Sequence, residues 1–356
     1  MLLSLMNMLI FGMVGFLLMY TVYRPLLNKF ALTQELSLKF FPMPYMAGIY
    51  VIGTIVAYLF TDNKDFIEPL TLLRAFLPLV LAGLIYAAFL FFGEISFCLT
   101  VAVAVGISVW LQPLGAGVEM WGMPPYLARL VVFIFGVMFC LGMRILNILP
   151  HTVIIQLSAI LFGLCVLCFV GASPLFVALS AAVLMGILCA FLSLNYYEIK
   201  LDWDDGTCVA ISYLVCYLML LNVGEFSFPS CVVFTMLLWV EIIMALYRKY
   251  ILSSAGMLRE NTNCYNGAEI FTLQGLSANV LRVCAVLLFL GWFQLFSINQ
   301  YSLLIVSFCI ALWLGSALGR VQPTSIKEIN KEFISDLKQN IAETKNLLSR
   351  QKKDDE

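Results

Sequence analysis

Residues 191–208, with the sequence FLSLNYYEIKLDWDDGTC, place a group of acids between two strongly apolar runs. Lys200 is the only base in this stretch. The acidic residues of the stretch are Glu198, Asp202, Asp204 and Asp205. An acid cluster between hydrophobic spans is costly unless it faces water, a cation or a polar ligand. We therefore expect a functional site here, completed by other polar loops on the same side of the spans.

The composition of the whole chain predicts an all-α, polytopic integral membrane protein. The sequence is 62% hydrophobic and only 12% charged, and its mean hydropathy is +0.98. Its apolar runs predict about eleven transmembrane helices. These lie near residues 2–23, 45–60, 73–91, 95–112, 126–146, 152–171, 174–193, 207–222, 228–247, 277–297 and 300–319. We divide the chain into a transmembrane domain, residues 1–320, and a tail, residues 321–356.

The distribution of Lys and Arg predicts the orientation of these spans. If the N-terminus lies outside, the outer side holds only Lys64, Arg74 and Arg129, and the other basic residues fall on the inner side. Inner loops of membrane proteins carry an excess of positive charge. The acid cluster and the C-terminal tail are therefore predicted to be cytoplasmic.

Cysteine and histidine usage argues against a zinc site or structural disulfides. The eleven cysteines fall singly in or near apolar runs, and Cys165 and Cys168 lie in mid-span, where cysteine usually packs as a small apolar residue. The only histidine, His151, follows a proline at a span boundary, where a structural role is the simpler explanation. The net charge of −1 gives no reason to expect nucleic acid as a partner.

The tail has the pattern of an amphipathic helix. Ser325 and Glu328 fit a capping box directly after Pro323. An apolar stripe follows at helical spacing, formed by Ile326, Ile329, Phe333, Leu337, Ile341 and Leu348. Two interpretations stay open: a solvated helix lying on the domain, or a coiled-coil surface that binds a protein partner or a second copy.

Four landmarks, in their order along the chain, resemble the membrane phospho-N-acetylhexosamine transferases. They are Pro44–Gly48, Asn195 with Asp204–Thr207, Glu241 with Tyr247–Lys249, and Gly275–Ser277. Members of that family move a phosphosugar from a UDP-sugar to polyprenyl phosphate. The resemblance implies a multi-pass protein of the bacterial inner membrane, with undecaprenyl phosphate as the lipid and a role in cell envelope or polysaccharide biosynthesis.

The chain departs from that family at most of its catalytic motifs. The family's Asp-Asp pair is absent from residues 86–93, and the first acid there is Glu94. In the motif that begins at Asn147, the two aspartates are replaced by Pro150 and Val153. The histidine motif falls near residues 263–266, which contain no histidine. Loss of several members of a cooperative catalytic set usually costs many orders of magnitude in rate.

These losses predict a pseudoenzyme that keeps the fold without the transferase reaction. Joining two phosphates requires Mg²⁺ held by carboxylates, and only Asp205, with help from Asp204, could replace the family's metal ligand. We expect no catalytic residues and no cofactor, with Mg²⁺ only if activity persists. The expected role is a lipid-carrier-binding or scaffold subunit. The alternatives are a divergent transferase that uses Asp204, Asp205 and Glu241, and a transporter with Glu241 on its pathway.

Each candidate residue also has a structural interpretation. The candidate groove consists of Asn147, Asn195, Asp204, Asp205, Gly206, Thr207 and Glu241. Asp204 and Asp205 would equally suit the N-terminus of the helix that begins near Thr207. Arg144 is expected to anchor the end of its span. Glu241 is either a functional intramembrane acid or a hydrogen-bonded one close to the interface.

Overall fold

A computed structural model describes residues 2–31, 43–60, 69–111, 124–147, 150–169, 175–197 and 204–223, together with residues 235, 238, 239 and 242. This part of the chain is helical apart from short connections. Its helices are α1 (Leu2–Ala31), α2 (Met43–Phe60), α3 (Pro69–Phe91), α4 (Glu94–Leu111), α5 (Pro125–Leu146), α6 (Pro150–Phe169), α7 (Leu175–Tyr197) and α8 (Asp205–Val223).

The helices confirm the all-α membrane class. Four of them are long and apolar enough to cross a membrane: Leu5–Val22, Glu94–Leu111, Pro125–Leu146 and Leu175–Leu194. Shorter apolar helices lie between them at Met46–Ala57, Phe76–Phe91, Val153–Cys165 and Asp205–Leu221. The last predicted spans lie almost wholly outside the described residues, as does the tail, so the total of eleven spans and their orientation stay predictions.

Proline sets the start of several helices. Pro69, Pro125 and Pro150 each stand at the first position of a helix, where a residue without an N–H group loses no hydrogen bond. At α5 the preceding Pro124 is extended, with φ −62° and ψ 147°. Each of these prolines comes directly after residues that the sequence predicts to lie between two spans. The prolines therefore mark where each connection ends and the next helix begins.

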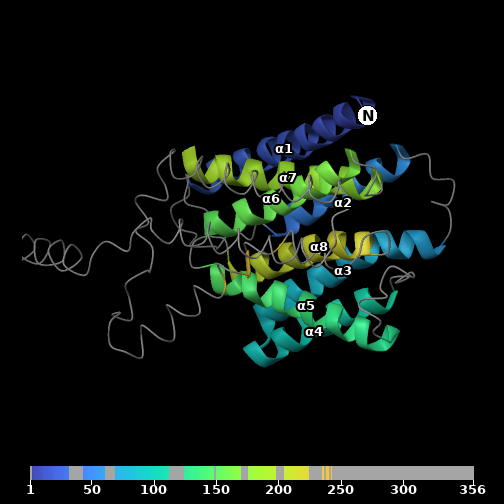
Figure 1. Ribbon diagram of the computed structural model, residues 1–356. Helices are drawn as coiled ribbons and strands as arrows, with labels where there is room; N and C mark the ends of the chain where they lie inside the picture. The colour runs from blue at the N-terminus through green and yellow to red at the C-terminus, as the bar shows by residue number, and fades with distance from the viewer. Residues whose placement is uncertain are drawn as a thin grey trace, which may run out of the picture.

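Helices α7 and α8 form the centre of the described bundle. Of the window Leu175–Leu194, 72% is buried, against 22% of Leu5–Val22 and 33% of Glu94–Leu111. Every residue from 206 to 220 is buried. Helix α1 lies along α7 at one edge of the bundle, and α4 lies beside α5 at the other edge (Figure 1).

A buried pair of hydroxyl groups joins the outer helix α4 to the central helix α8. The oxygens of Ser108 and Tyr213 are 2.6 Å apart, and the Ser108 hydroxyl also lies 2.8 Å from the carbonyl oxygen of Ala104. Since the single Ser108 proton can serve one acceptor, this arrangement lets Tyr213 donate to Ser108 while Ser108 donates to Ala104. Such buried pairs fix how two apolar helices are rotated against each other.

Candidate functional site: the polar cluster at the start of α8

Asp204 caps helix α8. Its Oδ1 atom accepts a hydrogen bond from the backbone N–H of Thr207 at 2.6 Å, and its carbonyl oxygen accepts one from the N–H of Cys208 at 3.0 Å. An aspartate at this position satisfies a free N–H group of the first turn and places negative charge at the positive end of the helix dipole. The structural interpretation of Asp204 is thus realised in the structure.

The neighbouring Asp205 faces two donors from the end of α5. Arg144 Nε donates to its Oδ2 atom at 2.9 Å, and Asn147 Nδ2 donates to its Oδ1 atom at 2.8 Å. Each carboxylate oxygen therefore holds one hydrogen bond from a protein donor. A charged bond of this kind is stronger than one between neutral groups.

Arg144 extends this contact to a third helix. Its Nη2 atom lies 3.0 Å from Oε1 of Glu94, the first residue of α4. The centre of the guanidinium lies 5.6 Å from the centroid of the Phe97 ring, within the range of a cation–π contact. We call Glu94, Arg144, Asn147 and Asp205 the Arg144 cluster. It ties together the ends of α4, α5 and α8.

Exposure differs strongly among the members of the Arg144 cluster. The side chains of Arg144 and Asp205 are 26% and 34% exposed, whereas that of Glu94 is 82% exposed. Water therefore screens the Arg144–Glu94 pair much more than the Arg144–Asp205 pair. Of these two ion pairs, Arg144–Asp205 is therefore the one that contributes more to the contact between the helix ends.

Gly206 allows the start of α8 to pack against α3. A Cβ atom at this position would lie 2.5 Å from Cδ1 of Phe89, closer than two carbon atoms can approach. The Phe89 ring in turn contacts Phe97 edge-on, with centroids 5.6 Å apart. The Asp-Asp-Gly sequence thus has three separate uses: a cap, an ion pair and a close helix contact.

Thr207 is the remaining polar group of this helix start. Its side chain is fully buried, and its Oγ1 atom has no hydrogen-bond partner among the described residues. A buried hydroxyl group without a partner is costly. Within the described chain, Thr207 is therefore one polar group at this end that a bound molecule or a further residue would satisfy.

The structure brings together most of the predicted groove. Asn147, Asp204, Asp205, Gly206 and Thr207 lie within one connected cluster. Asn195 lies in the last turn of α7, and its side chain is outside the described part, as is Glu241. The tail stripe of Ile326, Ile329, Phe333, Leu337, Ile341 and Leu348 also lies outside the described residues.

Two members of the cluster were not predicted as site residues. Arg144 was expected only to anchor its helix, and Glu94 was noted only as the first acid after α3. The available signal was their placement, since each stands at the end of an apolar run on the side predicted to be cytoplasmic. An isolated charge at such a place commonly has a partner on a neighbouring helix.

Comparison with known proteins adds no relative. No family model matches the chain, and no curated protein matches it either. Among the described residues, no three His, Cys, Asp or Glu side chains lie together in a group that could hold a metal ion.

Proposed function

We propose that this protein is a non-catalytic scaffold or regulatory subunit of a membrane-bound system for bacterial envelope or polysaccharide biogenesis. In this proposal it has the fold of the polyprenyl-phosphate phosphosugar transferases without their reaction. The observation that carries the proposal is the engagement of Asp205 by Arg144 and Asn147. The sequence landmarks support the biological setting.

The contacts of Asp205 disfavour a role as magnesium ligand. Both of its oxygens hold protein donors, at 2.9 and 2.8 Å. A metal ion would have to displace one of these donors and would then lie beside the positively charged guanidinium of Arg144. Mg²⁺ needs several well-placed oxygen ligands, and one carboxylate oxygen of Asp204 already accepts the capping hydrogen bond of α8.

The charge balance favours the scaffold role over binding of the phosphate carrier in this groove. Within the Arg144 cluster and the cap of α8, three acids, Glu94, Asp204 and Asp205, stand against one base, Arg144. A lipid phosphate beside these four residues would meet more negative than positive charge, and like charges repel. A protein surface with complementary basic residues suits this end better.

The first test measures the transferase reaction. The purified full chain is mixed with UDP-GlcNAc, undecaprenyl phosphate and Mg²⁺, and UMP release is followed. We expect no release above that of a protein-free sample, and the same result for Asp205→Asn. Magnesium-dependent UMP release that disappears in Asp205→Asn would overturn the proposal in favour of a divergent transferase.

The second arm of the test concerns the partner. The full chain and a chain ending at Gln322 are purified from their native membrane in mild detergent. We expect a protein at fixed stoichiometry with the full chain and not with the shortened one, because the tail stripe is the predicted binding surface. Equal recovery of that protein with both chains would place its binding surface elsewhere.

A further inference from the structure

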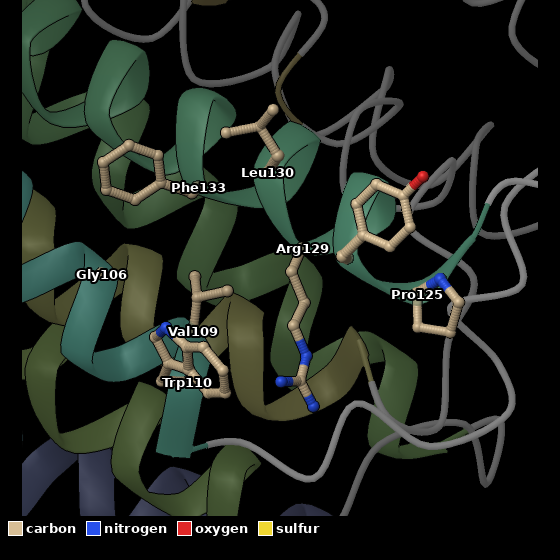
Figure 2. A pocket seen from close by; sticks show the side chains of 8 residues that line it. Gly106, Val109, Trp110, Pro125, Arg129, Leu130 and Phe133 are labelled. Carbon is tan, nitrogen blue, oxygen red and sulfur yellow. The ribbon is translucent and has the colours of Figure 1, made fainter.

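A second site lies at the other end of α4 and α5. The two helices run in opposite directions, so that Glu94 and Arg144 meet at one end while Trp110 and Arg129 meet at the other. A pocket of about 640 Å³ opens between the helices there (Figure 2). It is lined by Gly106, Val109, Trp110, Pro125, Tyr126, Arg129, Leu130 and Phe133.

The charge of this pocket comes from Arg129. Its side chain extends from α5 toward Trp110 (Figure 2), and the centre of its guanidinium lies 5.0 Å from the centroid of the indole ring. Within the described part of the chain, Arg129 forms an ion pair with no carboxylate. A guanidinium that contacts a ring through its face keeps its in-plane N–H groups for an acceptor.

The first turn of α5 adds to this positive charge. Pro125 is the first residue of the helix, and Arg129 follows one turn later. The positive end of the helix dipole lies here, although Pro125 has no N–H group and the N–H groups of Leu127 and Ala128 already donate to the carbonyl oxygen of Pro124. This pocket therefore has the opposite charge character to the Arg144 cluster, where acids are in excess.

The remaining walls of the pocket are apolar or aromatic. Val109, Leu130 and Phe133 line it, and Leu130 and Phe133 lie on the side away from the guanidinium of Arg129 (Figure 2). Trp110 and Tyr126 are 75% and 74% exposed, at the ends of two helices long enough to cross a membrane. Trp and Tyr at such positions are typical of the boundary between lipid headgroups and acyl chains.

We propose that this pocket binds one anionic phospholipid, with the phosphate on Arg129 and part of an acyl chain along Val109, Leu130 and Phe133. A soluble anion would leave the apolar walls in contact with water, and an uncharged lipid would leave Arg129 without an acceptor. Only a molecule with both parts matches both halves of the pocket. The site is separate from the Arg144 cluster and does not depend on the proposed function.

The test titrates phosphatidylglycerol and diacylglycerol, which has the same acyl chains but no phosphate, onto the purified full chain and counts bound lipids by native mass spectrometry. We expect wild type to bind the anionic lipid about fivefold more tightly than the neutral one, the effect of one cation near a lipid phosphate. Arg129→Gln should remove that preference. Arg129→Lys should keep part of it, because charge remains while the planar donor geometry is lost.

A pair of glycine variants tests the pocket independently of charge. A Cβ at Gly106 would lie 3.5 Å from Phe133 Cε2, whereas none of the described atoms lies within 4 Å of one at Gly83. Gly106→Leu should therefore fill the pocket and weaken lipid binding, and Gly83→Leu, the same change on α3, should leave it as in wild type. Wild type without any preference, or a preference that survives both Arg129→Gln and Gly106→Leu, would overturn the proposal.

Discussion

At the scale of single residues, Arg144 carries the clearest prediction. Arg144→Gln leaves the part-buried carboxylate of Asp205 without its charged donor, so the free energy of unfolding should fall by about 1–3 kcal/mol. Arg144→Lys should lose less, because charge remains but the fork geometry is lost. Thermal unfolding of the full chain in detergent, followed by tryptophan fluorescence, measures the differences between variants.

Glu94 provides the control for this prediction. Its side chain is 82% exposed, and an ion pair so open to water contributes at most about 1 kcal/mol. Glu94→Gln should therefore unfold close to wild type. If it loses as much stability as Arg144→Gln, the contact with Asp205 is not the one that holds the helices.

Sequence patterns at this scale identify residues better than they identify contacts. The Asp-Asp-Gly-Thr stretch and Asn147 were predicted to lie in one groove, and the structure places Asn147 within hydrogen-bond distance of Asp205. The pairing of Arg144 with Asp205 and Glu94 was missed because the partners are 61 and 50 residues away. Nothing in the local sequence states which helix ends become neighbours.

At the scale of helices, the contact between α1 and α7 depends on glycine. A Cβ at Gly186 would overlap the carbonyl oxygen of Gly12, an atom of the α1 backbone that cannot turn aside. Gly186→Ala must push the two helices apart, and overpacking of this kind costs about 1–3 kcal/mol. The same unfolding measurement should show a clear loss of stability.

Gly12→Ala is the matched change on the same contact. Its Cβ would lie 3.5 Å from the carbonyl oxygen of Ala182, an ordinary van der Waals distance. Alanine also favours a helix over glycine by up to about 1 kcal/mol. The Gly12→Ala variant should therefore unfold at or slightly above the wild-type temperature. If Gly12→Ala loses as much stability as Gly186→Ala, the close approach of the backbone at Gly186 is not what makes that position sensitive.

Apolar runs placed the described helices correctly but misjudged several of their ends. The first run was predicted to stop near residue 23, and α1 continues to Ala31; the seventh was predicted to stop near 193, and α7 continues to Tyr197. Hydropathy reports where a helix is apolar, whereas the helix itself ends where its backbone hydrogen bonding ends. Hydropathy therefore does not detect the more polar last turns of α1 and α7.

At the scale of the whole molecule, the orientation in the membrane is the open prediction. The placement of Lys and Arg predicts an outer N-terminus and a cytoplasmic C-terminus. Green fluorescent protein fused after Glu356 should fluoresce in a bacterial host, and alkaline phosphatase fused after Asn63 should be active. If the green fluorescent protein fusion is dark and the alkaline phosphatase fusion is inactive, the orientation is the reverse of the predicted one.

Composition alone decides the class of this molecule, since a chain with 62% hydrophobic residues has no other way to bury its surface. The function of the protein is harder to predict. Asn195 and Glu241 can belong to one site only if the loops that carry them lie close together in space, and the sequence does not show this. The structure adds one thing that no pattern suggested, the Arg129 pocket, because its residues come from two helix ends whose pairing the sequence does not state.

The Arg144 cluster also sets an order of events during synthesis. Glu94 and Arg144 leave the ribosome well before Asp205, which follows Arg144 by 61 positions. Until then, the nascent chain holds an arginine at a membrane boundary with only a water-exposed glutamate to offset it. The hairpin of α4 and α5 therefore cannot complete its polar contacts until α8 has been synthesised. We expect translation that stalls before that point to release a fragment in which Arg144 lacks its part-buried partner.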